Sequence, residues 1–264
     1  MNKKLNTDSS IETKQMTLVL QPSGEVKIKL AGMGTAFIDW GDGTQCETHK
    51  LTDFNEDDWK QKSKYNYCHN YCDNSTCVII ITGDNITHLC CESMRLTNLD
   101  VSKNTGLIYL DCFDNQLTSL DVSSNNLLKE LCCSTNQITS LKLNTELSII
   151  NCRLNLLTSL DVRKLPKLRA LNCSQNQITN LDVSKNAELE YLSCIQNQIT
   201  KLDISNNEIE NLRCDTTVDI FVNKKDSKEE LTSEMENIQI NIDLSSFLHS
   251  HTREELIDFL NRTE

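Results

Sequence analysis

The chain of 264 residues contains thirteen cysteines, and their thiols can take part in more kinds of reaction than its other side chains. A thiol can form a disulfide, ligate a metal ion or act as a nucleophile. Seven of them recur 19 to 21 residues apart: Cys91, Cys112, Cys133, Cys152, Cys173, Cys194 and Cys214. This regular spacing predicts a ladder of free thiols that pack as small apolar groups in a narrow core. Disulfides between adjacent repeats are the alternative, but in-register strand positions seldom allow good disulfide torsions.

A second group of cysteines lies before the repeats, in the segment CHNYCDNSTC that contains Cys68, His69, Cys72 and Cys77. Three thiols and an imidazole can hold zinc tetrahedrally, although no second CxxC pair accompanies them. A local disulfide, in an exported protein, is the other interpretation. We assign neither a metal nor a cofactor to the chain.

Catalytic patterns are missing from the sequence. It contains no GxSxG, no phosphate-binding glycine loop and no HExxH, and only seven glycines in all. The histidines do not stand at a recognisable spacing from a nucleophile. Cys90 and Cys132 are predicted to be the repeat thiols that point outward, where one of them could react. We nevertheless predict that the protein is not an enzyme.

Aspartate and asparagine also recur with the period of the cysteines. The aspartates are Asp100, Asp121, Asp161, Asp182 and Asp203, and the asparagines are Asn115, Asn136, Asn155, Asn176 and Asn197. A calcium column is one interpretation of the carboxylates, but the repeat lacks the glycine-rich oxygen pattern of a calcium β-roll. We favour hydrogen bonds to Ser, Thr and backbone N–H groups or to lysines. The asparagines are predicted to satisfy buried backbone groups at the corners of stacked coils.

The period belongs to a repeat of the form LxxLxCxxNxL followed by TSLDVSxN, which begins at Ile86 in a degenerate copy and ends near residue 218. Alternate positions of a strand point the same way, so Leu110 and Cys112 should face inward and Asp111 outward. No coil can bury its own leucines, and neighbouring coils must therefore stack.

This pattern resembles the leucine-rich repeats of bacterial proteins, in the 21-residue form common in Bacteroidetes-type sequences, with cysteine in place of the third leucine. The resemblance implies a mainly β fold. We expect a solenoid of about seven coils over residues 86–222, with an N-terminal β-sandwich cap and a C-terminal strand and helix cap.

The segment before the repeats has strand signals at 16–20, 25–30 and 77–82, with a tight-turn signal at Asp42-Gly43. WGDGT at 40–44, His69-x-Tyr71 and the following VIII resemble the PKD-type immunoglobulin-like β-sandwich, although the tyrosine usual in its last strand is absent. The resemblance implies a PKD-like domain over 16–85, after a flexible stretch at 1–15. We expect this domain to cover the open edge of the solenoid, with Ile79, Ile81 and Ile86 leading into the first coil.

The last segment, 223–264, is predicted to cap the other end of the solenoid. IQINID at 238–243 alternates as a strand does, and Thr252 with Glu255 forms a capping box that opens a terminal helix. The alternative is a detachable amphipathic helix that docks into a partner.

The net charge of −12 disfavours nucleic acid and anionic lipid surfaces as partners. We also find no apolar run long enough to insert into a membrane, and we expect a monomer. Residues 1–15 lack the apolar core of a secretory signal. The expected location is the cytoplasm if Met1 is the native start, and the cell surface or the exterior if a leader has been removed.

Outward positions of the repeat strands give the candidate binding surface. Its predicted contact residues are Tyr109, Phe113, Arg153, Tyr191, Ile195 and Arg213, because aromatic and arginine side chains often anchor interfaces and burial in the core does not account for them. The leading hypothesis is a non-enzymatic module that binds a protein partner on the outer face of the repeat sheet. The alternatives are a cytosolic immunity-type protein that neutralises a basic toxin, and an extracellular surface adhesin.

Overall fold

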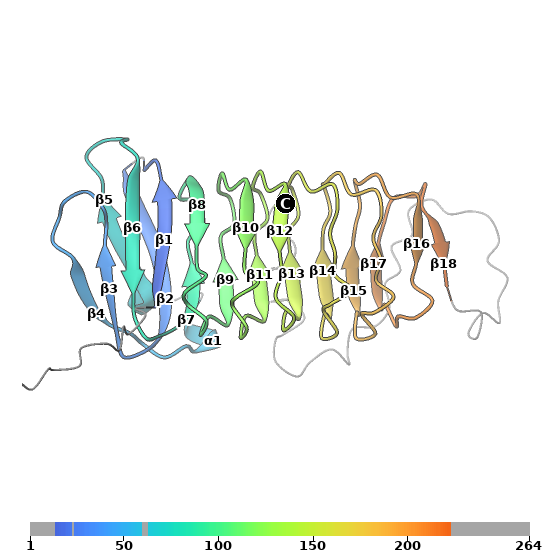
Figure 1. The fold of residues 1–264 in the computed structure, drawn as a ribbon, viewed down its shortest axis with the longest axis horizontal. Coiled ribbons are helices and arrows are strands. Elements are labelled where there is room, and N and C mark those ends of the chain that lie inside the picture. Colours follow the sequence, from blue (N-terminus) through green and yellow to red (C-terminus); the bar gives the residue numbers. More distant parts are fainter. Residues whose placement is uncertain (1–13, 23, 60–62, 223–264) are drawn as a thin grey trace, which may run out of the picture.

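The protein is a rod of short β-strands joined by turns, with almost no helix in the described residues, as the computed structural model shows (Figure 1). The structure describes residues 14–22, 24–59 and 63–222. The strand and helix expected within 223–264 therefore lie outside the described residues. In the described part, the helices α1 (Glu56–Trp59) and η1 (Ser63–Tyr65) are too short to cross a membrane.

The rod has two walls, and each repeat from β9 to β15 contributes a strand to the first, whereas the segments at 160–162 and 181–183 contribute no strand to the second. The strands of the first wall are β7 (Asn85–Cys90), β9 (Tyr109–Asp111), β11 (Glu130–Cys132), β13 (Ile149–Asn151), β14 (Ala170–Asn172), β15 (Tyr191–Ser193) and β17 (Asn211–Arg213). Those of the second wall are β8 (Leu96–Asp100), β10 (Ser119–Asp121), β12 (Ser140–Lys142), β16 (Lys201–Asp203) and β18 (Asp219–Phe221).

Strands of the first wall pair in parallel and in register, so that each repeat position stacks on the same position of the next repeat. Leu110 and Cys112 point into the interior and are fully buried, which confirms the predicted alternation. Six parallel strands follow β7, which corresponds to about six turns rather than the seven expected. The difference arises at the copy that begins with Ile86, because β7 has an antiparallel neighbour on its other side.

The N-terminal strands extend both walls. They are β1 (Gln15–Leu20), β2 (Glu25–Met33), β3 (Thr35–Asp39), β4 (Glu47–Lys50), β5 (Asn66–Asn70) and β6 (Cys77–Thr82). β2 pairs with β7 and with β5, which gives a nine-stranded sheet, and β1 pairs with β8 and with β6 in a sheet of five strands. One hydrophobic core runs from Met16 to Leu212 between the walls.

Asparagines at the bend after each first-wall strand supply hydrogen bonds to the coil before. The amide of Asn115 donates to the carbonyls of Cys91 (2.9 Å) and Cys112 (3.0 Å), and its oxygen accepts from the N–H of Leu96 (2.9 Å). The equivalent bonds recur at Asn136, Asn155, Asn176 and Asn197. The prediction that these asparagines satisfy buried backbone groups is therefore confirmed.

The residue before each of these asparagines has a left-handed backbone, with φ between 53° and 56° at Asp114, Thr135, Leu154, Gln175 and Gln196. This conformation costs about 1–2 kcal/mol for a residue other than glycine. The N–H of Leu154 donates to the carbonyl of Ser174 in the next coil at 3.0 Å, so the stacked neighbour helps to hold the bend.

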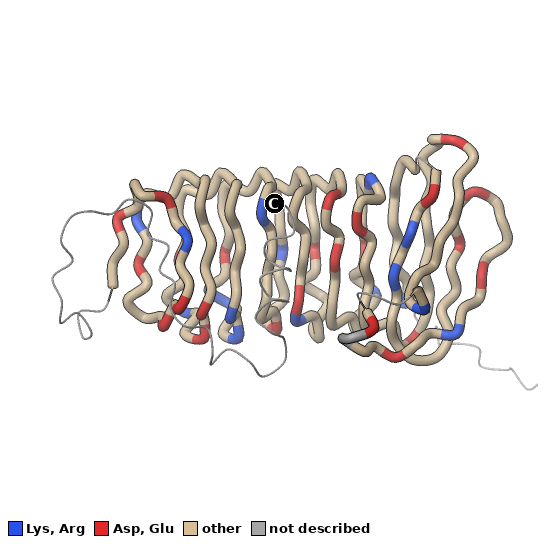
Figure 2. The backbone as a smooth tube through the Cα atoms, turned by 180° about the vertical axis from the view of Figure 1, so that it is seen from behind, with Lys and Arg blue, Asp and Glu red and all other residues tan. Residues whose placement is uncertain are grey.

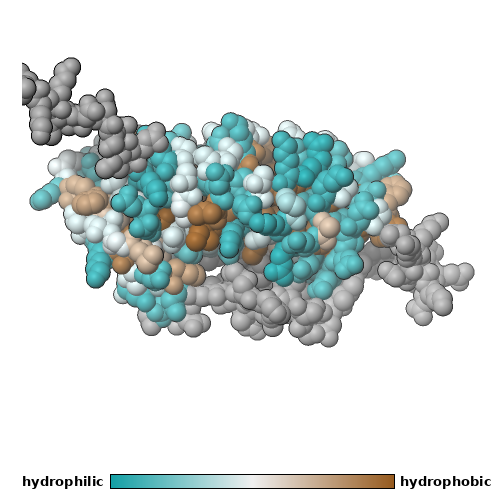
Figure 3. Space-filling model, turned by 60° about the horizontal axis from the view of Figure 1, so that its bottom comes forward, coloured by the Kyte–Doolittle hydropathy of each residue, from teal (hydrophilic) through white to brown (hydrophobic). Residues whose placement is uncertain are grey.

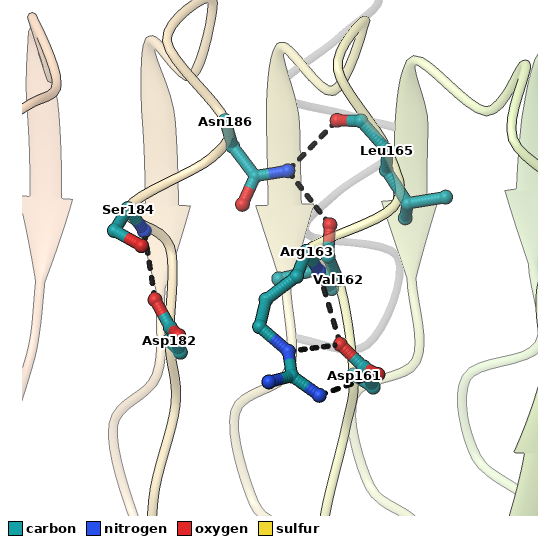
Figure 4. Close-up of polar contacts among 7 residues, drawn as sticks. All are labelled: Asp161, Val162, Arg163, Leu165, Asp182, Ser184 and Asn186. Atoms are coloured by element: carbon teal, nitrogen blue, oxygen red, sulfur yellow. Dashed lines mark hydrogen bonds and ion pairs between the residues drawn. The ribbon is translucent and has the colours of Figure 1, made fainter.

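A second ladder of asparagines, which the sequence analysis did not single out, lies in the LDVSxN half of the repeat. Asn186 is fully buried and donates to the carbonyls of Val162 (2.8 Å) and Leu165 (2.7 Å) in the preceding coil (Figure 4). Asn104, Asn125, Asn144 and Asn207 occupy the same position, whereas the coil between Asn144 and Asn186 has Leu165 there.

The recurring aspartates of this half accept hydrogen bonds from residues of the turn that follows them. Asp182 accepts from the N–H of Ser184 at 3.0 Å, and Asp161 accepts from the N–H (3.1 Å) and the guanidinium (2.9 Å) of Arg163 (Figure 4). The Arg163 side chain lowers the pKa of Asp161 to about 2. The hydroxyl of Ser123 and then the ammonium of Lys142 lower the pKa of Asp121 to about 2 as well. Hydrogen bonds to serine, backbone and basic groups thus accompany these carboxylates, as the favoured interpretation predicts.

Gly32 marks the junction between β2 and β7. A Cβ atom there would lie 2.0 Å from the carbonyl oxygen of Asn85, and φ is 154°. We expect Gly32→Ala to disrupt this pairing and to lower the melting temperature sharply, as thermal unfolding followed by circular dichroism would show. Gly34→Ala is the control, because its Cβ would meet nothing within 4 Å and only the φ of 89° opposes it. Equal losses for both variants would contradict the close approach at Gly32.

Adjacent asparagines allow a matched test of the second ladder. Asn125 is buried and donates to the carbonyls of Val101 (2.9 Å) and Asn104 (2.8 Å), whereas the side chain of Asn126 is exposed. Asn125→Leu should lower the free energy of unfolding by about 1–3 kcal/mol for each carbonyl left without a donor, while Asn126→Leu changes it little. Leu165 shows that leucine fits this position. Denaturant unfolding of both variants measures the difference, and similar values would refute the role of the ladder.

Candidate functional site

The outer face of the nine-stranded sheet, meaning the side chains that point away from the interior core, has an apolar cluster of its own. This outer cluster consists of Ala31, Trp59, Tyr65, Cys90, Tyr109, Cys132, Ala170 and Tyr191, with Phe54, Phe113 and Ile149 packed against it. Alternation along each strand separates it from the interior core, because Tyr109 and Asp111 flank the inward Leu110. The same sheet therefore has apolar side chains on both of its faces.

The predicted contact residues divide into two groups. Tyr109 and Tyr191 lie outside the interior core, as expected, but they are buried in the outer cluster, with 9% and 8% of their surface exposed. Phe113, Arg153, Ile195 and Arg213 are partly exposed. The structure brings Tyr109, Phe113 and Tyr191 into the outer cluster, but Ile195 and the two arginines are not part of it.

An aromatic bracket, formed by Phe54, Trp59 and Tyr65 between β4 and β5, is the reason for the burial of Tyr109. Phe54 stacks on the ring of His88 at 3.8 Å, and the ring of Trp59 meets that of Tyr109 at 6.0 Å. The hydroxyl of Tyr65 accepts from the N–H of Asn55 (3.1 Å) and donates to the carbonyl of Asp53 (3.0 Å), which fixes the bracket.

Sequence reasoning missed the bracket, because its residues belong to no repeat and contact partners far away along the chain. The available signal was compositional. Aromatic residues make up only 5% of the chain, yet Phe54, Trp59 and Tyr65 fall within twelve positions. Such a concentration in a segment without strand signals indicates a local packing role.

Polar groups lie in and around the outer cluster. The hydroxyl of Tyr109 donates to the carboxylate of Asp111 at 3.2 Å, whereas the buried hydroxyl of Tyr191 has no hydrogen-bond partner. Arg153 donates to the side-chain oxygen of Gln175 at 2.7 Å. Burial beneath the bracket lowers the pKa of His88 to about 4, so this imidazole is neutral near pH 7.

All thirteen cysteines are free thiols in the structure. Cys90 and Cys132 lie on the outer face as predicted, but both are buried, so neither is an accessible thiol. Burial also raises the pKa of Cys90 well above the usual range, as it does for the inward thiols from Cys91 to Cys173. A thiol in such an environment is a poor nucleophile, since the thiolate is the reactive form.

The segment CHNYCDNSTC does not form a four-ligand site. Cys68 and Cys72 are exposed and Cys77 is buried, while His69 contacts Asp42 at 2.7 Å and stacks on Trp40 at 5.0 Å. Within the described ranges, the one group of three metal-ligating side chains whose ligand atoms lie within 4.8 Å of one another is Cys90, Glu92 and Asp111. His69 contacts Asp42 of the WGDGT turn. The PKD-type identity of this region stays a prediction.

Charged residues occur along the length of the rod. Figure 2 shows acidic and basic residues along its whole length, including the N-terminal strands. On the face in Figure 3, small apolar areas alternate with polar ones. An acidic protein with this distribution has no basic band for a phosphate backbone within the described residues.

Comparison with known proteins gives structural neighbours only, since no family model and no curated protein match the chain. The functional domain of InlJ from Listeria monocytogenes, described as including a cysteine ladder, shares 43% identity with a TM-score of 0.48. The match covers 54% of this chain and 32% of that one. A leucine-rich-repeat protein of Leptospira interrogans shares 26% identity with a TM-score of 0.47, over 51% of this chain and 38% of that one.

YopM from Yersinia enterocolitica shares 30% identity with a TM-score of 0.33, over 45% of this chain and 28% of that one. The matches thus span well under half of each neighbour. The fold class follows from the repeat and from the parallel strand pairing. On that basis the chain is a β-solenoid built from leucine-rich-type repeats, and the neighbours are bacterial leucine-rich-repeat proteins.

His88 provides a test of the bracket through its pH dependence. Its pKa is lowered to about 4 from 6.5, so the folded state excludes a proton that the unfolded state binds below pH 6.5. Its contribution to stability is therefore complete above pH 6.5 and is lost as the pH falls towards 4, by about 2–3 kcal/mol at most. His88→Phe should retain the stacking and flatten this part of the profile, as urea unfolding between pH 7 and pH 4 would show. An unchanged slope would mean that His88 is not buried in solution.

Proposed function

We propose that the protein is a non-enzymatic interaction module and that a protein partner binds the outer face of the nine-stranded sheet. The observation that carries the proposal is the outer cluster, because the interior core already holds the coils together and does not need a second apolar cluster across six repeats. The members of the cluster are buried, but Phe113 and Ile149, which pack against it, are partly exposed and extend its apolar character to the surface, where a partner could contact it.

The partly exposed side chains are the proposed contacts. Phe113 and Ile195 provide apolar area, while Arg153 and Arg213 provide donors for carboxylates or carbonyls of a partner. Tyr109 and Tyr191 are buried, so they pack beneath this surface and are not proposed to contact the partner directly. Seven strands at about 4.8 Å give a sheet roughly 30 Å long, which matches an interface of standard size.

The chemistry of the partner follows from charge. At −12 the chain attracts basic proteins and repels polyanions, which favours a basic protein partner. This feature also supports the second candidate function, a neutralising protein for a basic toxin. A surface adhesin stays an alternative.

Paired substitutions test the proposed face. Phe113→Ala with Ile195→Ala should weaken binding of a partner at least about tenfold, since loss of one anchoring side chain can cost more than 1 kcal/mol. Leu127→Ala with Leu156→Ala is the matched control, because both leucines are exposed apolar residues outside the strands of the outer face. The partner is first captured from cells on immobilised wild-type protein, and its affinity for each purified variant is then measured by calorimetry.

A specific loss of affinity in the first pair supports the proposed face. Equal affinity for the wild type and both pairs would remove the outer face from the interaction. A larger loss in the Leu127 and Leu156 pair would place the partner on the corners of the coils instead.

A further inference from the structure

Three side chains that can ligate a metal ion meet at the N-terminal end of the outer face. Cys90 ends β7, Glu92 follows it by two residues, and Asp111 ends β9 as the register partner of Cys90. The thiol sulfur and one oxygen of each carboxylate lie within 4.8 Å of one another. The set combines one soft ligand, the thiol, with two hard ones, the carboxylates, and therefore differs from a purely acidic cluster.

Asp111 is held in place from two sides. Its carboxylate accepts the hydroxyl of Tyr109 at 3.2 Å and the N–H of Phe113 at 3.1 Å, and no part of the residue is exposed. Hydrogen bonds that orient a ligating carboxylate are the usual surroundings of a metal ligand.

The thiol of Cys90 differs from the interior thiols. Cys91 and Cys112 each donate an S–H to a carbonyl of the next coil at 3.5 Å. Cys90 is more than nine-tenths buried, yet the described residues include no acceptor to which its thiol donates. The Cys90 sulfur lies within 4.8 Å of an oxygen of each carboxylate, so a divalent cation among the three groups would supply the positive charge that a buried thiolate needs.

A cavity of about 220 Å³ adjoins these residues. Cys90 and Glu92 line it together with Met94 and with Glu25, Lys27 and Lys29 of β2. It has room for water molecules that could complete the coordination of an ion. The ammonium groups of Lys27 and Lys29 on the wall of this cavity offset part of the negative charge of Glu92.

We propose that Cys90, Glu92 and Asp111 bind a divalent transition-metal ion of the zinc class, with a fourth position open to the cavity. Zinc accepts thiolate and carboxylate ligands together, and three protein ligands with one open position are a known arrangement for it. The thiol releases one proton to solvent on binding. The ion would connect β7 to β9 at the point where the N-terminal strands join the repeats.

Cobalt provides the test, because a thiolate bound to Co²⁺ gives a charge-transfer absorption that carboxylates do not. The full chain with Cys46→Ser, Cys68→Ser and Cys72→Ser, which removes the three exposed thiols, is titrated with Co²⁺. We expect one ion per chain with a thiolate band that Zn²⁺ displaces. Cys90→Ser should abolish the band, and Glu92→Gln or Asp111→Asn should weaken binding by about tenfold or more.

Cys132→Ser is the matched control. Cys132 is buried on the same face and is the register partner of Asp111 on β11, but Ser134 stands two residues beyond it in place of a carboxylate. This variant should keep the band and the stoichiometry. Absence of a thiolate band in the parent protein, or a band that survives Cys90→Ser while circular dichroism shows a folded chain, overturns the proposal.

Discussion

The rod depends on one requirement: the backbone carbonyls that lie inside the bends of each coil must find hydrogen-bond donors. Each coil turns so tightly that the backbone oxygens of Cys91 and Cys112 lie inside the bends, where Asn115 and Asn136 of the respective next coils donate to them. An asparagine amide from the next coil satisfies them, and a second amide does the same on the opposite wall. Because each donor comes from a neighbour, no coil is complete without the one beside it.

Because the inward side chains and the asparagines hold the coils together, the residue types on the outer face can differ from one repeat to the next. The inward positions of the first wall repeat leucine and cysteine almost without exception, whereas the outward column changes from Tyr109 to Glu130, Ile149 and Ala170. Variation at positions that do not contribute to the interior core is what a binding surface requires. The buried tyrosines, the aromatic bracket and the site formed by Cys90, Glu92 and Asp111 all lie on that variable face.

Periodicity made much of the fold predictable. The inward direction of Leu110 and Cys112 and the role of Asn115 follow from spacing alone, because each position repeats in the same environment. Contacts without a period were not predictable. The stacking of Phe54 on His88 is one of these contacts, because it joins segments more than thirty residues apart. The proximity of Cys90 to Asp111 is not, because the two residues stand one repeat apart and are register partners. The burial of Tyr109 was missed because the bracket that covers it belongs to no repeat.

The continuation of both walls into the N-terminal strands has a consequence for dissection of the molecule. A cut between residues 85 and 86 falls inside β7, and it would separate that strand from β2 and the strand β8 from β1. The repeat fragment would then end in two unprotected β-edges, each able to recruit another chain. Expressed alone, such a fragment should self-associate, so the two halves of this protein behave as one cooperative unit rather than as interchangeable modules.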